Sequence, residues 1–248
     1  TFLILGVSFA YDTVATTYNK TELESLVNTT IKNYDTSDLG DFNNPFRHSK
    51  LTGLIDDTDT SILNNTVTVT LAQFITPIVA TNSSYNVSFG NALYNPHSGH
   101  NASAGGIIAS TGFFLGGTTE YFFDDDGTGN LRIYSLVEAV RTYYDSEAGT
   151  VDYTKGIINI NPLSITSVSN VDGDVSAALR ITAIPNSNDI VPVRNQLLEI
   201  DTTNTTIVGS VDQTTATGTG YTTSVSSGGT VTTTTVSTPS STATSSGY

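Results

Sequence analysis

The stretch Phe42-Asn-Asn-Pro-Phe-Arg-His-Ser-Lys-Leu-Thr-Gly-Leu-Ile-Asp-Asp-Thr-Asp-Thr-Ser-Ile62 decides the fold of the first part of this chain. It follows the pattern of an amphipathic helix and precedes the pattern of a strand. Within it, Leu51, Leu54 and Ile55 share helical spacing, which predicts a short helix from about residue 47 to residue 55. No part of the stretch has the composition of an active site.

A longer helix is predicted before this stretch. Thr21-Glu-Leu-Glu24 has the spacing of a capping box, in which the Thr21 hydroxyl and the Glu24 carboxylate bind free amides at a helix start. Five apolar residues then recur at helical spacing, namely Leu23, Leu26, Val27, Ile31 and Tyr34. We expect this helix to stop near residues 35–40.

Strand patterns lie on both sides of the two helices. The segments 2–5 and 7–11 read as short strands interrupted by Gly6, and Val67, Val69 and Leu71 alternate with threonine as in a half-buried strand. Residues 1–80 are therefore predicted to form a strand-helix-helix-strand module. Its helical stripe and its strands should share one core.

Residues 81–201 have the pattern of an antiparallel β-rich domain, so the fold class is α+β. Tyr85, Val87 and Phe89 alternate as in a strand. Three glycine-containing stretches predict hairpin turns. These turns join strands at 120–123 and 131–137, at 140–144 and 151–153, and at 165–168 and 175–184. Regular strands with such turns favour a sandwich or a meandering sheet.

Residues 202–248 form a low-complexity tail in which 27 of 47 residues are Ser or Thr and Asp212 is the only charged residue. Such a segment cannot bury enough apolar surface to offset its chain entropy. We expect it to run extended and to be ordered mainly by β-augmentation onto another copy or another protein. Because the chain starts at Thr1 and contains no Met, we also expect a processed product or the C-terminal part of a longer polypeptide.

The composition argues against several classes of partner. The formal charge of −14, with only 9 Lys and Arg, predicts no nucleic-acid binding. The chain has no Cys, which excludes disulfide and thiolate chemistry. The apolar run Phe2-Leu-Ile-Leu-Gly-Val7 is too short to span a bilayer, so no membrane partner is expected. No cofactor motif or small-molecule substrate site is evident.

Candidate catalytic and metal sites are weak, and we expect none. Asp124-Asp-Asp-Gly-Thr-Gly-Asn130 could offer oxygen ligands to Ca²⁺, but the twelfth position of an EF-hand loop falls on Ser135, so a solvated hairpin turn is favoured. His97 and His100 lack an evident third metal ligand. His48 reads as an ordinary, partly buried side chain. The crowded acids at 56, 57 and 59 read as a solvated loop.

Three segments resemble the inner-ring baseplate wedge subunit (J-like family, C-terminal part) of T-even-type contractile-tailed phages. The first is Val7-Ser-Phe-Ala-Tyr-Asp12 leading into Thr21-Glu-Leu-Glu-Ser-Leu-Val27. The second is Phe42-Asn-Asn-Pro-Phe-Arg-His-Ser-Lys-Leu51 with Leu54-Ile-Asp-Asp-Thr-Asp-Thr-Ser-Ile62, which is the most specific. The third is Pro185-Asn-Ser-Asn-Asp-Ile-Val-Pro-Val-Arg-Asn195. The tail after residue 201 departs from the family.

This resemblance implies a structural virion protein of the tail baseplate and no enzyme. Such a subunit pairs with itself, as a dimer or a ring, and with other wedge or hub proteins. It supports tail assembly and the switch that triggers sheath contraction, and it would be assembled in the host cytoplasm. The family implies no catalytic residue.

Two other classes of function remain open from the residues themselves. A β-rich virion-surface or secreted adhesion module with a Ser/Thr stalk would explain the tail, but it explains the helical module poorly. A glycan hydrolase comes third. An adhesin should bind glycans, and an enzyme should show a concave pocket with converging carboxylates.

Overall fold

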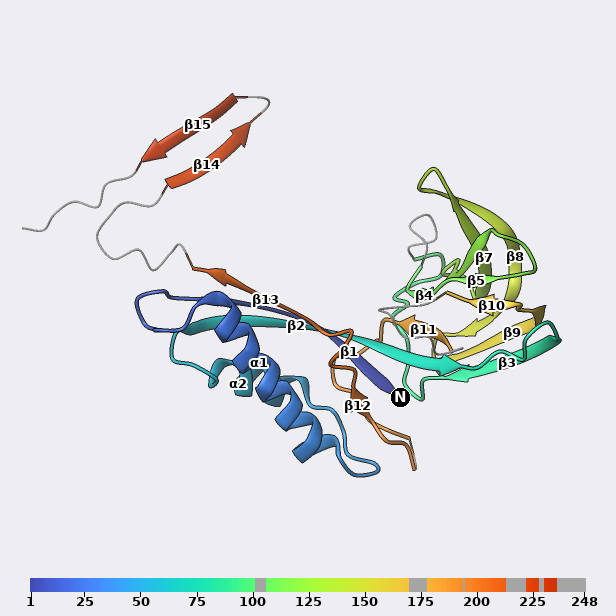
Figure 1. The fold of residues 1–248 in the computed structure, drawn as a ribbon, viewed down its shortest axis with the longest axis horizontal. Helices are drawn as coiled ribbons and strands as arrows, with labels where there is room; N and C mark the ends of the chain where they lie inside the picture. The colour runs from blue at the N-terminus through green and yellow to red at the C-terminus, as the bar shows by residue number, and fades with distance from the viewer. Residues whose placement is uncertain (101–105, 170–177, 194, 213–221, 228–229, 236–248) are drawn as a thin grey trace, which may run out of the picture.

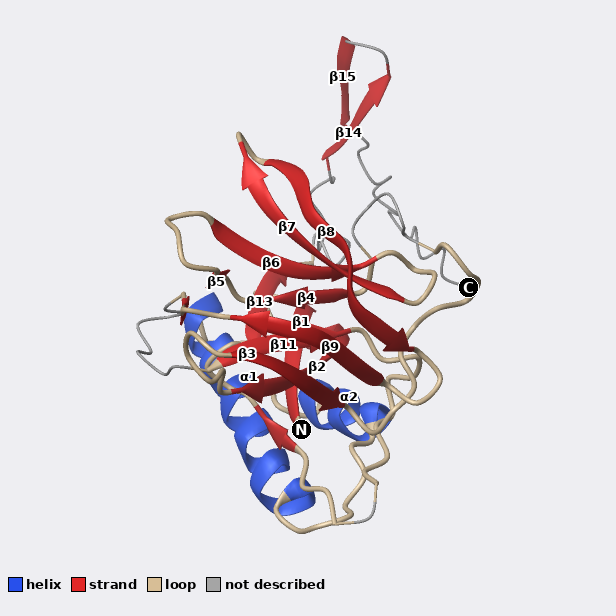
Figure 2. Ribbon diagram, turned by 90° about the vertical axis from the view of Figure 1, so that its right-hand side faces the viewer, coloured by secondary structure: helices blue, strands red, loops and turns tan. Residues whose placement is uncertain are grey.

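The described residues form two large β-sheets and one two-stranded sheet, with two helices on one face of the first large sheet (Figures 1 and 2). The computed structural model describes residues 1–100, 106–169, 178–193, 195–212, 222–227 and 230–235. Two helices stand beside many antiparallel strands, so the predicted α+β class is confirmed. None of the helices in these ranges has the length and apolar content needed to cross a bilayer.

The first sheet takes strands from distant parts of the chain. Its order is β12 (Glu199–Ile200), β1 (Phe2–Tyr11), β2 (Ile62–Ile75), β11 (Leu179–Ala183) and β4 (Ile108–Ser110), and β13 (Thr206–Val211) also pairs with β1. The neighbours β1 and β2 are antiparallel, whereas β12 and β13 run parallel to β1. Helices α1 (Lys20–Tyr34) and α2 (His48–Asp56) connect β1 to β2, so the predicted strand-helix-helix-strand order is confirmed.

One core lies between the helices and the first sheet, as the apolar spacing predicts. Alternate residues of β1 and β2 are buried against the helical stripes. The buried members of the predicted set are Leu23, Val27, Ile31, Tyr34, Leu51, Ile55, Val67, Val69 and Leu71. Leu26 and Leu54 are only partly buried at the edge of this core. A five-residue π-helical turn, Asp35–Leu39, follows α1 within the range where we expected the helix to stop.

The capping box of α1 lies two residues before the predicted one. Asn19 is the N-cap: its side chain accepts a hydrogen bond from the Glu22 N–H, and the Glu22 carboxylate accepts one from the Asn19 N–H. The prediction of a box at Thr21 and Glu24 was therefore wrong. Asparagine caps a helix as well as threonine does, and both candidates have an acid three residues later.

This correction has a measurable consequence for stability. Asn19→Ala should lower the free energy of unfolding by about 0.5–2 kcal/mol, because the Glu22 N–H at the helix start loses its side-chain acceptor. Thr21→Ala is the matched control, and we expect it to change stability by less than about 0.5 kcal/mol. Urea unfolding of both variants measures the difference. A larger loss for Thr21→Ala would place the cap at Thr21 after all.

Strand β1 is continuous, so the predicted interruption at Gly6 was wrong. The strand pairs with β2 through Gly6 without a break until a register shift at Ala10 and Tyr11. A Cβ atom at Gly6 would collide with the Thr68 hydroxyl, which donates a hydrogen bond to the Gly6 carbonyl at 3.2 Å. The glycine thus marks a close approach between neighbouring strands and not a strand end.

The second sheet is a meander. Its order is β10 (Ser167–Val168), β5 (Phe113–Phe114), β6 (Glu120–Asp125), β7 (Asn130–Val137), β8 (Val140–Asp152), β9 (Ile157–Ser164) and β3 (Asn82–Ser88). Strands β5 to β9 are neighbours in chain order. The predicted hairpin between 120–123 and 131–137 is confirmed as β6 and β7.

The other two predicted hairpins are wrong. Residues 146–149 form no turn, because β8 runs through them as one strand. A Cβ atom at Gly149 would collide with the Asn159 carbonyl, so this glycine lets β8 pass close to β9. For the third hairpin, β10 pairs with β5, whereas β11 pairs with β2 and β4 in the first sheet. The expected turn at 170–177 lies outside the described residues.

Part of the expected tail belongs to the first sheet. Strand β13 (Thr206–Val211) pairs in parallel with β1 from Gly6 to Tyr11, and the Gly209 N–H donates a hydrogen bond to Glu24 at 2.9 Å. The prediction that residues 202–248 are ordered mainly from outside is therefore wrong for this strand. Parts of all three predicted segments, 1–80, 81–201 and 202–248, meet in one sheet.

Candidate functional site

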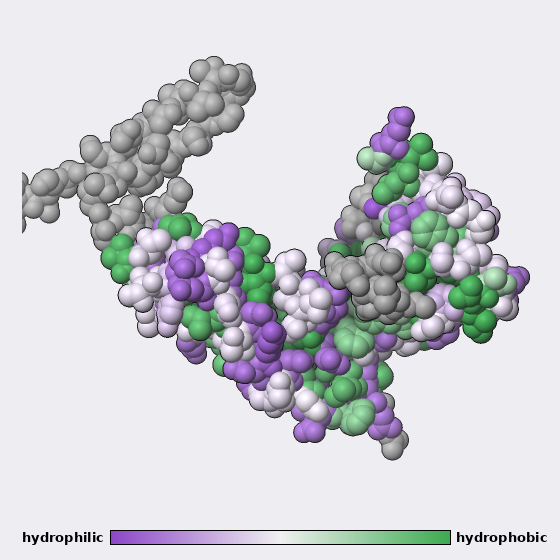
Figure 3. Space-filling model, in the orientation of Figure 1, coloured by the Kyte–Doolittle hydropathy of each residue, from purple (hydrophilic) through white to green (hydrophobic). Residues whose placement is uncertain are grey.

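The hairpin of β7 and β8 projects beyond the rest of the second sheet and is the most prominent surface feature of that sheet (Figures 1 and 2). We call residues 136–147 the β7–β8 arm. All of them are exposed. Five are large and apolar, and Val140 and Tyr144 are 66 % and 62 % exposed. The other three are Leu136, Val137 and Tyr143. In Figure 3 an apolar area lies directly below the polar tip of this projection.

The tip of the arm is a two-residue turn without glycine. Val137 pairs with Val140, and the two residues between them, Glu138 and Ala139, have φ values of 50° and 64°. Two consecutive residues with positive φ match the twist of the flanking strands, but they disfavour residues with a Cβ. Because neither Glu138 nor Ala139 is a residue typical of such turns, the sequence analysis did not predict a hairpin between β7 and β8.

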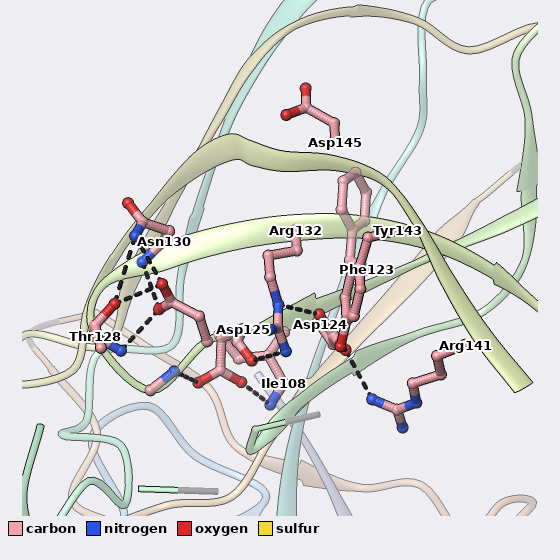
Figure 4. A network of polar contacts seen from close by, with 12 residues as sticks. Ile108, Phe123, Asp124, Asp125, Thr128, Asn130, Arg132, Arg141, Tyr143 and Asp145 are labelled. Atoms are coloured by element: carbon pink, nitrogen blue, oxygen red, sulfur yellow. Dashed lines mark hydrogen bonds and ion pairs between the residues drawn. The ribbon is translucent and has the colours of Figure 1, made fainter. Parts of the chain in front are cut away.

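A buried ion-pair network fixes the base of the arm (Figure 4). Asp124 on β6 is 1 % exposed and binds two arginines. One carboxylate oxygen accepts from Arg132 Nε at 2.9 Å, and the other accepts from Arg141 Nη1 at 2.7 Å and from the Tyr143 hydroxyl at 3.1 Å. Arg141 and Tyr143 belong to the arm, so Asp124 ties the arm to the body of the sheet.

Aromatic rings complete this anchor. The Arg132 guanidinium lies 4.3 Å from the centre of the Tyr143 ring, and that of Arg141 lies 4.6 Å from the Tyr134 ring. Phe122 stacks on Tyr134 with ring centres 5.6 Å apart. These contacts hold the side chains that flank the arm in defined positions, which lowers the entropy cost of binding a partner there.

Asp125 is a second buried acid with a different role. Its Oδ1 accepts from the N–H groups of Ile107 and Ile108 at 2.7 and 2.8 Å, and its Oδ2 accepts from the Tyr153 hydroxyl at 2.6 Å. Burial and this hydrogen bond raise the pKa of Tyr153. A Cβ atom at Gly106 would collide with the Asp125 carboxylate. Asp125 therefore joins the start of β4 to the second sheet.

The structure corrects the prediction of a solvated turn at residues 124–130. Only four residues, 126–129, connect β6 to β7, and Asp124 and Asp125 are buried in β6. At Asp126, partial burial acts to raise the pKa, but hydrogen bonds from Thr128 and Asn130 outweigh it and lower the pKa to about 2. All three carboxylates are thus occupied by donors of the protein itself, so the arrangement does not fit a Ca²⁺ loop.

The histidines give no metal site in the described part of the chain. His97 Nε2 and His100 Nδ1 lie 3.2 Å apart, and the His100 ring packs against Tyr94. No group of three or more His, Asp or Glu side chains converges there as metal ligands. His48 is partly buried as predicted, and its Nε2 lies 2.9 Å from the Val67 carbonyl.

Two segments that are far apart in the sequence meet at the start of α2. Phe46 and Ile190 exchange two backbone hydrogen bonds, at 2.9 and 3.1 Å. Asp189 accepts from the His48 N–H at 2.9 Å and pairs with Arg47 at 3.1 Å, and these two contacts lower the pKa of Asp189. Helix α2 has no side-chain cap of its own, so Asp189 caps it from another part of the chain.

This geometry suits assembly better than catalysis. In the described residues, the buried carboxylates Asp124 and Asp125 are bound by arginines, amides and a tyrosine, and neither lies free to accept a proton from a substrate. The arm instead presents apolar and aromatic side chains on a rigid support. Exposed aromatic side chains of this kind are enriched at protein–protein interfaces.

Comparison with known proteins supports this class. Residues 1–73 match the family model described as baseplate structural protein gp6, C-terminal domain III. The match covers 73 of 248 residues, from β1 through both helices and most of β2. It supports a structural phage baseplate protein located in the virion tail. No curated protein matches the sequence.

Proposed function

We propose that this chain is a wedge subunit of the inner ring of a contractile-tail baseplate. In this role it contacts copies of itself and other wedge or hub proteins, and it supports the switch that leads to sheath contraction. Its assembly takes place in the host cytoplasm before the tail is complete. The observation that carries the proposal is the match of residues 1–73, which include β1, both helices and most of β2.

The contacts around α2 give independent support. The segment 185–195 resembles the same family as the stretch 42–62 and lies outside the matched residues. The two segments nevertheless bind each other through Phe46 and Ile190, and Asp189 caps α2. The matched residues therefore contact a segment of the chain that the match does not cover.

The β7–β8 arm is the surface we assign to a neighbouring baseplate subunit. Because it is apolar and rigidly anchored, removing its exposed side chains should weaken assembly without unfolding the chain. We expect Val140→Ser combined with Tyr144→Ser to reduce the amount of a tagged chain incorporated into phage tails by at least about tenfold, equal to about 1.4 kcal/mol of binding free energy. Quantitative blotting of purified tails measures it.

A matched control is available in the loop between β1 and α1. Val14 and Tyr18 are 75 % and 45 % exposed and lie before α1, away from the arm. The pair Val14→Ser and Tyr18→Ser removes the same side-chain types, and it should leave incorporation unchanged. Equal incorporation of the arm variant and the unaltered chain would show that the arm faces no neighbour. Complete absence of the unaltered chain from tails would contradict the proposed function itself.

A further inference from the structure

The last described element is a hairpin that pairs with nothing else. Strands β14 (Thr222–Ser227) and β15 (Thr230–Thr235) are antiparallel and in regular register from end to end. Among the strands that the structure describes, each has the other as its only partner, so both outer edges are open. A two-stranded sheet by itself is marginally stable in water, and three or more strands are needed for independent stability.

The hairpin has none of the features that usually protect an open strand edge. Natural edge strands carry lysines, prolines or bulges that prevent pairing with other chains. The segments 222–227 and 230–235 contain only Ser, Thr and Val, and their pairing shows no register shift. Threonine and valine also favour the extended conformation. Both edges are thus open to strand addition.

The distribution of charge along the chain indicates which strand could add to these open edges. All 9 Lys and Arg and all 23 Asp and Glu precede Gln213, so residues 213–248 carry no charged side chain. The charged part has a net charge of −14, which opposes close approach of two copies, whereas two hairpins meet no such repulsion. A strand that fits these edges should be uncharged and rich in β-branched residues. The same hairpin on a second copy meets this requirement.

We propose that the β14–β15 hairpin pairs edge to edge with the same hairpin of a second copy of this chain, which extends both into one intermolecular sheet. A two-fold arrangement brings like edges together, so β15 meets β15 or β14 meets β14. This inference rests on the proposed function for its setting, since it names the element through which wedge subunits self-associate. The experiment that tests it measures whether the purified chain self-associates. Its outcome therefore does not depend on where the chain lies in the tail.

The register shows which backbone groups are free. Ser227 pairs with Thr230, and the two are separated by two residues in the sequence. In hairpins whose paired strand ends are separated by two residues, the end pair is hydrogen-bonded, so we infer that Ser227 and Thr230 are such a pair and that every second pair is too. The pair Ser224 and Thr233 falls between such pairs, and its N–H groups point to the outer edges. Proline at either position should therefore leave the hairpin intact and block strand addition to that edge only.

Sedimentation velocity of the full-length chain at several concentrations tests the inference. We expect the unaltered chain to self-associate, and Ser224→Pro or Thr233→Pro to weaken its association at least about tenfold, with the sensitive position identifying the edge used. Thr233→Lys should act like Thr233→Pro if β15 is that edge. Thr244→Lys, which adds the same charge beyond the hairpin, should leave association unchanged.

Two results would overturn the inference. The first is an unaltered chain that sediments as a monomer at every concentration. The second is an association that neither outer-edge proline weakens, because the copies would then meet through another surface. Neither result would contradict the proposed location of the chain in the baseplate. That location is tested separately, by electron microscopy of phage particles labelled with antibodies against the chain.

Discussion

Leu23→Ala should lower the free energy of unfolding by about 2–5 kcal/mol. Leu23 is completely buried where α1 packs on the first sheet, in one core with Val27 and Ile31. Truncation removes its apolar contacts and leaves a cavity, because the helix and the sheet are held in place by many other contacts. Urea unfolding with an unchanged m-value would report this loss as a lower midpoint.

Leu26 provides the matched control, because it lies on the same helix and is only partly buried. Leu26→Ala removes the same atoms, and we expect a clearly smaller loss than for Leu23→Ala. The sequence alone placed both leucines in the core, so this pair tests the helix register given by the structure. Equal losses would show that α1 is rotated relative to the position described here.

Asp124→Ala should lower the free energy of unfolding by about 3–5 kcal/mol, because the largely buried Arg132 loses its carboxylate partner and keeps the weaker hydrogen bond to the neutral Asp125 carbonyl. The Arg132 side chain is only 12 % exposed and cannot move into water without disturbing the packing of Tyr143. Arg141 is 38 % exposed and can be hydrated more readily. The main loss therefore arises at Arg132, and chemical unfolding of the variant measures it.

A second readout locates this effect in the arm. Without Asp124, Arg141 and Tyr143 lose their common partner, so amides of residues 136–147 should exchange with solvent faster than in the unaltered chain. Asp145→Ala is the control: Asp145 is exposed and accepts a backbone hydrogen bond from Glu147, so its removal should change stability by less than about 0.5 kcal/mol. Similar losses for both variants would contradict the assigned network.

Periodicity was sufficient to predict the first module. The helical stripe of α1 and the alternation in β2 gave the right elements, because both depend on one apolar face. The cap was harder, since Asn19 and Thr21 are equally good candidates by sequence. Only the contacts of Glu22 in the folded chain decide between them.

Several features of the two large sheets could not be predicted from local sequence patterns. Glycine marks turns in many sequences, but Gly149 marks a close approach of β8 to β9, and the true turn at Glu138 and Ala139 has no glycine. The parallel pairing of β13 with β1 joins residues about 200 positions apart, and no local signal reports it. The Asp124 network escaped prediction for the same reason, because its partners come from different strands.

The central claim is that this chain is a structural part of a phage tail baseplate, and its position in the particle tests that most directly. Antibodies against the full-length chain, coupled to gold, can be imaged by electron microscopy on purified particles of the phage that encodes it. We predict label at the end of the tail distal to the capsid, where the baseplate lies. Label confined to the capsid or to the tips of fibres, or particles that lack the chain, would contradict the account.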